Sequence, residues 1–119
     1  MQIITGQDTT HSRDTKARKR QKTSYFSKPE LTRILNVYSR RVAAGEWRDY
    51  AIDHLDGLAY FSIYRSSHEM PLYTIEKKRL KGKDRWQFKL SDRRKVIKTC
   101  AVLQDILDYL NGLPRLVNN

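Results

Sequence analysis

The sequence is poor in the residues that build covalent or membrane-spanning frameworks. Its 119 residues include one cysteine, Cys100, so an internal disulfide framework is excluded and a reducing compartment is expected. No run approaches the roughly 20 apolar residues that span a bilayer. The N-terminus lacks the basic stretch and the apolar stretch of a secretory signal. We therefore expect a cytoplasmic protein that does not associate with a membrane.

Motifs for common catalytic and cofactor chemistry are also missing. The sequence contains no His-x-x-x-His pair, no pair of cysteines and no Gly-rich phosphate loop, so the zinc and nucleotide signatures are absent. Ser62 lacks the glycine context of a nucleophile elbow, and Cys100 has no adjacent histidine. We predict no cofactor, no metal and no small-molecule substrate, and we do not expect an enzyme.

Acidic residues are outnumbered by basic ones. The 24 Lys and Arg residues exceed the 13 Asp and Glu residues, which gives a net charge of +11. The basic excess lies before residue 46 and after residue 78, whereas the segment between them is slightly acidic. A positive charge favours polyanions such as nucleic acid. A merely solubilising role explains the same composition, so both interpretations stay open.

The first 24 residues form a polar and basic stretch. They contain too little apolar surface to offset the entropy lost on ordering. We therefore expect a disordered basic tail over residues 1–24 and a single domain over residues 25–119. A basic cluster in this tail would add affinity as a flexible arm or would only keep the chain soluble. The cluster consists of Arg18, Lys19, Arg20 and Lys22.

Two segments have the apolar periodicity of helices. The first, residues 28–44, follows Ser27, which can cap it, and Glu30 lies three positions after Ser27 and completes a capping box. Its apolar residues recur at spacings of three and four, which places them on one face. The second helix is predicted over residues 101–111, and a glycine and a proline follow it.

Between the helices, five segments alternate apolar and polar residues with the period of a strand. Their connections are short, which implies an antiparallel meander, and Asp56-Gly57 favours a tight hairpin between the first two. The predicted fold is α+β, with an antiparallel meander sheet of about five strands and with an N-terminal and a C-terminal helix packed on one face. The predicted strands are residues 47–54, 58–65, 72–78, 85–90 and 95–99.

The alternation assigns side chains to the two faces of this sheet. The face opposite the helices is predicted to be polar, and it includes Tyr60 and Tyr64, which would stack nucleic-acid bases if they were exposed. The face under the helices is predicted to hold Tyr50, Ile52, Phe61, Ile63, Tyr73, Ile75, Trp86, Phe88 and Leu90.

A second basic cluster lies in the C-terminal half of the chain. Two neighbouring connections would project its charges from one region of the sheet, as basic β-ribbons approach a phosphate backbone. A solvated basic face is the alternative interpretation. The cluster consists of Lys77, Lys78, Arg79, Lys81, Lys83, Arg85, Arg93, Arg94, Lys95 and Lys98.

Acidic, basic and imidazole groups gather around the first strands. They could supply a general base or an oxygen-rich metal site, but pairing across strands explains them more simply. A pair between Glu69 and Arg48 or Arg65 would hold the connection after the second strand against the sheet. Alternatively, Arg48, Arg65 and His54 would bind an anionic group. The candidate site or structural cluster is Arg48, Asp49, His54, Arg65 and Glu69.

Two strings in this region carry a family resemblance. Residues 46–54, Glu-Trp-Arg-Asp-Tyr-Ala-Ile-Asp-His, and residues 70–73, Met-Pro-Leu-Tyr, are similar to a family of short alphaproteobacterial proteins, the domain of unknown function 2794. The similarity covers about residues 26–78 well and is thinner beyond them. It implies a shared folding unit, and it assigns no activity and no site residue.

These observations favour a small non-enzymatic cytoplasmic binding protein that associates with nucleic acid through its basic hairpin and tail. The alternative is a protein–protein adaptor that uses the strand from Trp47 to His54 and the polar sheet face. A third hypothesis is a small hydrolase or a metal-dependent enzyme that uses Asp49, His54 and Glu69.

Overall fold

The computed structural model describes residues 24–66, 69–81 and 85–114, which form one sheet and two helices. Every predicted helix and strand is present, and its bounds differ from the prediction by at most two residues. The order is α2 (Lys28–Ala43), β1 (Asp49–Leu55), β2 (Leu58–Tyr64), β3 (Tyr73–Arg79), β4 (Trp86–Ser91), β5 (Val96–Cys100) and α3 (Leu103–Asn111).

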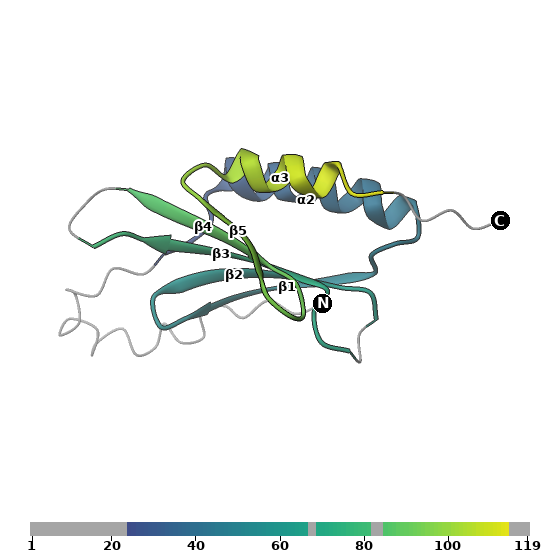
Figure 1. Cartoon of the computed structure of the whole chain (residues 1–119), viewed down its shortest axis with the longest axis horizontal. Coiled ribbons are helices and arrows are strands. Elements are labelled where there is room, and N and C mark those ends of the chain that lie inside the picture. The colour runs from purple at the N-terminus through teal and green to yellow at the C-terminus, as the bar shows by residue number, and fades with distance from the viewer. Residues whose placement is uncertain (1–23, 67–68, 82–84, 115–119) are drawn as a thin grey trace.

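The sheet is an antiparallel meander in the order β1-β2-β3-β4-β5, and both helices cover the same face (Figure 1). The predicted fold is therefore confirmed. Because consecutive turns of a meander alternate between its two ends, the turns at Asp56-Gly57 and at residues 80–85 share one end, which we call the hairpin end. The connections at residues 65–72 and 92–95 share the other, which we call the loop end.

The hydrophobic core lies between the sheet and the helices. All nine side chains predicted to face the helices are buried or pack against the buried cluster. Ile106, Leu107 and Leu110 of α3 are almost completely enclosed against them. Burial of one such side chain contributes about 1.5–3 kcal/mol to the free energy of unfolding. The apolar residues at alternate positions of the strands therefore hold the sheet and the helices together.

Helix α2 begins and ends as its sequence predicts. The Ser27 Oγ accepts the Glu30 N–H at 3.2 Å, and the Glu30 carboxylate accepts the Ser27 N–H at 2.7 Å, which completes the predicted capping box. After the helix, Gly45 has a φ of +80°, a left-handed conformation that glycine adopts without steric cost. The chain then turns directly into β1.

The tail predicted over residues 1–24 lies outside the described residues, except for Ser24. The Ser24 N–H donates to the Gly57 carbonyl at 2.9 Å, so the chain joins the domain at the hairpin end. In the described part of the chain, neither helix has the length and apolar character needed to cross a bilayer.

Candidate functional site

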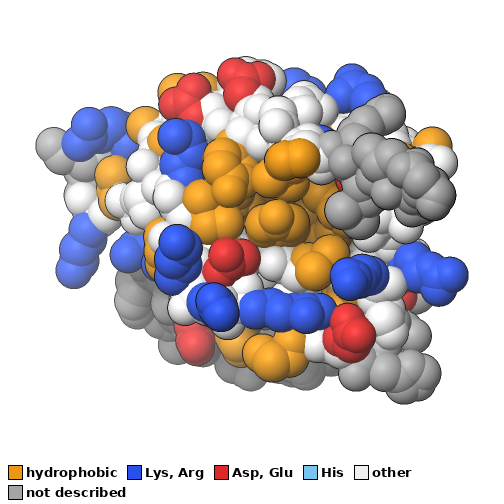
Figure 2. All heavy atoms as spheres, turned by 45° about the vertical axis from the view of Figure 1, so that its right-hand side comes forward, with side chains coloured by type: hydrophobic (Ala, Val, Ile, Leu, Met, Phe, Trp, Pro, Cys, Tyr) orange, Lys and Arg blue, Asp and Glu red, His pale blue; other side chains and the backbone are white. Residues whose placement is uncertain are grey.

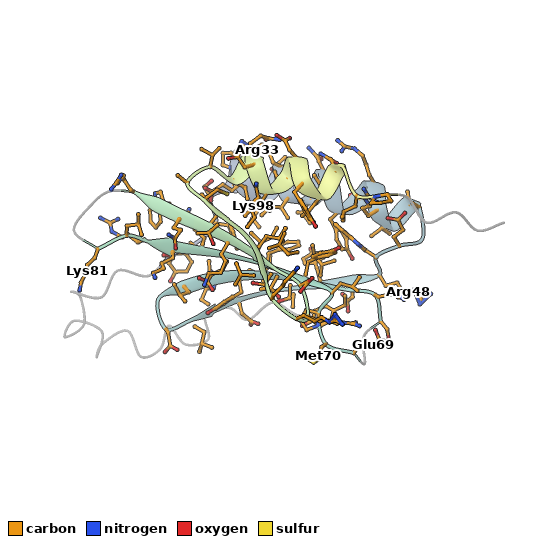
Figure 3. All side chains as sticks on the ribbon, in the orientation of Figure 1. Arg33, Arg48, Glu69, Met70, Lys81 and Lys98 are labelled. Carbon is orange, nitrogen blue, oxygen red and sulfur yellow. The ribbon has the colours of Figure 1, made fainter. Side chains whose placement is uncertain are left out.

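The second basic cluster is divided between the two ends of the sheet. Lys78, Arg79, Lys81 and Arg85 belong to the hairpin end, whereas residues 93–95 belong to the loop end. Figure 3 shows the separation, with Lys81 far from the loop-end residues Glu69 and Met70. The prediction that two neighbouring connections project these charges from one region is wrong, because consecutive turns of a meander point in opposite directions.

Two other members of this predicted cluster stand apart. Lys98 lies on β5 beside the helices rather than at either end (Figure 3). Lys83 lies outside the described residues.

Lys77 is a structural residue of the core face, which corrects its assignment to the basic cluster. Only 5% of it is exposed, and its Nζ lies 2.8 Å from the Glu30 carboxylate and 2.7 Å from the Tyr25 carbonyl oxygen. The ammonium also lies 4.4 Å from the centre of the Trp86 ring, a cation–π contact. Lys77 therefore joins β3 to the capping box of α2 and is not available to a phosphate.

The remaining hairpin-end cations lie on a two-stranded ribbon. The β2–β3 pairing ends at Ala59 and Lys77, and the β4–β5 pairing ends at Phe88 and Cys100. Beyond those positions β3 and β4 pair only with each other, and the Leu80 N–H still donates to the Arg85 carbonyl at 2.9 Å. The ribbon therefore projects past its neighbours (Figure 1).

The ribbon combines exposed and partly buried basic side chains. Lys78, Lys81 and Arg85 are exposed. The Arg79 guanidinium lies 5.4 Å from the centre of the Trp86 ring, which orients it along the ribbon. The ribbon thus carries several cations beyond the ends of its neighbouring strands.

At the loop end, Arg93 fastens the connection between β2 and β3. Its guanidinium donates to the Glu69 carboxylate and to the Met70 carbonyl, both at 2.9 Å, and to the Pro71 carbonyl at 3.3 Å. An arginine–carboxylate clamp on this loop was predicted, but the arginine comes from the β4–β5 turn and not from position 48 or 65. Both sequence candidates are nearer to Glu69 along the chain, but the antiparallel sheet places the β4–β5 turn at the same end as this loop, where Arg93 makes the contact.

The predicted acid–base cluster is dispersed. Asp49 and His54 occupy opposite ends and opposite faces of β1, about 17 Å apart at the usual rise of a strand. His54 packs against Tyr25, with 4.4 Å between the ring centroids, and burial lowers the pKa of its imidazole. Within residues 24–66, 69–81 and 85–114, no group of three or more His, Cys, Asp or Glu side chains could hold a metal ion.

The polar sheet face is less suited to nucleic acid than its tyrosines suggested. Burial raises the pKa of Tyr60, and the nearby Glu76 and Asp56 carboxylates raise it further. Lys89 lies 3.6 Å from Glu76 and offsets part of this negative charge. Carboxylates around Tyr60 would repel a phosphate backbone, so base stacking on this face is disfavoured.

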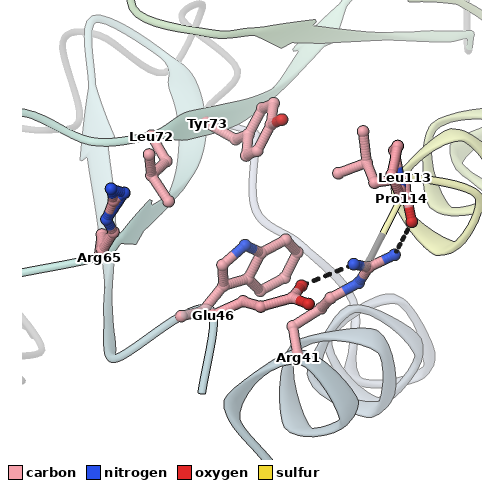
Figure 4. Close-up of a pocket in the computed structure, with 8 residues that line it drawn as sticks. Arg41, Glu46, Arg65, Leu72, Tyr73, Leu113 and Pro114 are labelled. Carbon is pink, nitrogen blue, oxygen red and sulfur yellow. Dashed lines mark hydrogen bonds and ion pairs between the residues drawn. The ribbon is translucent and has the colours of Figure 1, made fainter. Parts of the chain in front are cut away.

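A pocket at the loop end was not found from the sequence. It encloses about 310 Å³ between the end of β2, the start of β3 and the segment after α3 (Figure 4). Trp47, which is predicted to open the first strand, precedes β1, is 4% exposed and forms part of the wall. The pocket is lined by Arg41, Glu46, Trp47, Arg65, Leu72, Tyr73, Leu113 and Pro114.

Arg41 organises one side of this pocket. It is buried, its guanidinium lies 2.6 Å from the Glu46 carboxylate, and it donates to the carbonyls of Leu110, Asn111 and Leu113 at 2.9, 3.2 and 2.8 Å. It thereby supplies both hydrogen bonds and positive charge to the C-terminal end of α3. One sequence signal could have found it, because Arg41 falls seven residues after Ile34 on the buried face of α2.

The fold and these two sites define a small α+β domain with a basic ribbon at one end and a pocket at the other. Over residues 24–107 the chain matches the family described as Protein of unknown function (DUF2794), and it belongs to that family. The resemblance to this family seen in the sequence is thus confirmed. No curated protein and no solved structure matches the chain.

Proposed function

We propose that the protein binds double-stranded nucleic acid, without sequence preference, through the β3–β4 ribbon at the hairpin end. The observation that carries this proposal is the ribbon itself, which extends past β2 and β5 and carries Lys78, Lys81 and Arg85 in exposed positions. Two-stranded ribbons fit the major groove of a duplex, and exposed cations on them contact the phosphates beside it.

The basic tail joins the domain at the same end. The Ser24 N–H is bonded to Gly57, and the Tyr25 carbonyl is bonded to Lys77, so the chain enters between the β1–β2 turn and β3. Residues 18–22 precede Ser24 by no more than six positions. This short covalent connection to the hairpin end supports a contribution of their charges to the same interaction.

Phosphate contacts explain this surface better than base readout does. Arginine and lysine on the ribbon supply charge, whereas Gln87 is the one amide side chain among its described residues, 78–81 and 85–87. Tyr60 on the sheet face has carboxylate neighbours. The affinity is therefore electrostatic and falls as the salt concentration rises. For each phosphate contact, a tenfold rise in salt lowers the logarithm of the binding constant by about 0.9.

The test is fluorescence anisotropy with a labelled random-sequence duplex at salt concentrations from about 50 to 200 mM, the range over which phosphate contacts are screened. We expect the triple variant Lys78→Gln, Lys81→Gln and Arg85→Gln to bind at least tenfold more weakly and to show a shallower salt slope. The slope should fall by about 2–3, because up to three phosphate contacts are removed.

A matched variant separates this surface from net charge. Arg33→Gln, Arg40→Gln and Arg94→Gln also removes three exposed charges, but none of them lies at the hairpin end. Its affinity should fall by less than threefold. Equal losses in the two triple variants, or no duplex binding at the lowest salt, would refute the proposal.

A further inference from the structure

The pocket at the loop end is formed by segments that are distant in the sequence. Its walls come from the end of α2, the segment before β1, the end of β2, the start of β3 and the turn after α3. At about 310 Å³ it is at the lower limit of the usual range for ligand sites. That volume accommodates one large side chain and is small for a nucleotide or an extended cofactor.

The walls are held in place before any ligand arrives. Arg41 and Glu46 are paired to each other, and the Glu46 N–H donates to the Arg41 carbonyl at 2.9 Å. On the other side, the Leu72 N–H donates to the Ile63 carbonyl at 2.7 Å. A preformed pocket does not lose ordering entropy when it binds, so it favours a ligand of fixed shape.

The chemistry of the lining is apolar with one exposed cation. Trp47, Leu72, Tyr73 and Leu113 present rings and aliphatic groups, and burial raises the pKa of the Tyr73 hydroxyl, so it stays protonated as a donor. Arg65 is exposed at the edge, and within the described ranges it has no ion-pair partner. An arginine in this position favours a carboxylate, which it can bind through two parallel hydrogen bonds.

The surface around the pocket extends the same pattern. Figure 2 shows hydrophobic side chains gathered on the side of the molecule that includes the loop end, with both basic and acidic side chains around them, the basic ones more numerous. Arg48 and Lys95 are among the exposed cations at this end, and Tyr109 and Met70 are among the exposed apolar residues. A contiguous apolar patch with a charged rim is typical of a protein-binding surface.

From this complementarity we infer that the pocket binds an acidic segment of another protein, which inserts one aromatic or large aliphatic side chain. The side chain fills the space between Trp47, Leu72 and Leu113, and an Asp or Glu close to it in sequence pairs with Arg65. Binding of this kind concentrates its energy in one buried anchor surrounded by polar contacts. The acidic segment binds at the end of the molecule opposite the basic ribbon, so the protein can bind this segment and a nucleic acid at the same time.

The experiment selects peptides from a random display library against the full-length protein. We expect the selected peptides to combine Trp, Phe or Leu with Asp or Glu within a few positions. Arg65→Glu should weaken their binding at least tenfold, whereas Arg33→Glu, which makes the same charge change at an exposed position of α2, should change it by less than twofold.

The two tryptophans report where a selected peptide binds. The indole N–H of Trp47 lies at the pocket and that of Trp86 at the ribbon, so a nitrogen–proton correlation spectrum distinguishes the two ends. Peptide should shift the Trp47 signal and leave the Trp86 signal in place. Peptides without acidic residues, unchanged affinity in Arg65→Glu, or a shift of Trp86 alone would overturn the proposal.

Two other occupants of the pocket would also overturn it. Sedimentation that shows a dimer dissociated by Arg65→Glu would assign the pocket to a second copy of the chain. A rise of more than tenfold in peptide affinity after deletion of residues 115–119 would assign it to the chain's own C-terminal residues.

Discussion

The two ends of the sheet use the same kinds of basic residue in different ways. At the hairpin end, Lys78, Lys81 and Arg85 are exposed on a ribbon that has no neighbouring strands. At the loop end, Arg41 is buried against carbonyl groups and Arg93 is committed to a loop. Burial and hydrogen-bond partners, rather than residue type, therefore decide whether a basic side chain stabilises the fold or is available to a ligand.

Neighbouring residues show the same contrast within each end. Lys77 and Lys78 are adjacent in β3 and point to opposite faces, so that one is enclosed and the other is exposed. Arg40 and Arg41 are adjacent in α2, and the first makes one exposed hydrogen bond to Asn111 whereas the second makes a buried network. Each exposed residue is therefore a natural control for its buried neighbour.

The largest effect is expected for Arg41→Ala. The change leaves the Glu46 carboxylate and the carbonyls at the end of α3 without their buried partner, which typically costs about 3–5 kcal/mol of unfolding free energy. Urea unfolding followed by circular dichroism measures the loss. Arg40→Ala should cost less than about 1 kcal/mol, because its hydrogen bond is exposed; a similar loss in both variants would contradict the structural role of Arg41.

A smaller loss is expected for Lys77→Met at the hairpin end. It removes the partner of the Glu30 carboxylate and of the Tyr25 carbonyl, but the capping box still satisfies Glu30 in part. We expect a loss of about 2–3 kcal/mol in the same unfolding experiment, somewhat below the range of about 3–5 kcal/mol for a fully broken buried pair. Lys78→Met should stay within about 0.5 kcal/mol of the wild type.

The double variant Lys77→Met and Glu30→Gln separates burial of charge from packing. Glutamine keeps the capping box and removes the unpaired carboxylate, so part of the lost stability should return. If the double variant is as unstable as the sum of the two single variants, the ion pair is not the reason for the effect.

The smallest effect concerns His54 and pH. Burial lowers the pKa of this imidazole in the folded state, so the folded protein binds fewer protons than the unfolded chain just below the ordinary value of about 6.5. The contribution of His54 to the free energy of unfolding is therefore fully present above that pH, and it is lost as the pH falls through the pKa of the folded state. His54→Gln should flatten the stability curve between about pH 7 and 5; an unchanged curve would show that His54 does not contribute.

Local patterns in the sequence were sufficient for the elements and their faces. The capping box at Ser27 and Glu30, the Asp56-Gly57 turn and the alternation from Tyr50 onward each depend on residues a few positions apart. Short connections between the strands then left the meander as the simplest topology, and the core followed from the apolar face. These features could be predicted because their physical causes act within one turn or one hairpin.

Only the tertiary structure decided which charges are available and where a pocket forms. Lys77 and Lys78 look alike in a basic run, and Arg93 lies more than 20 positions from the loop that it fastens. The pocket needs five separate segments to meet, and Arg41 can occupy its wall only because α3 ends beside α2. Desolvation and hydrogen-bond partners depend on contacts between distant segments, whereas periodicity reports only the local direction of a side chain.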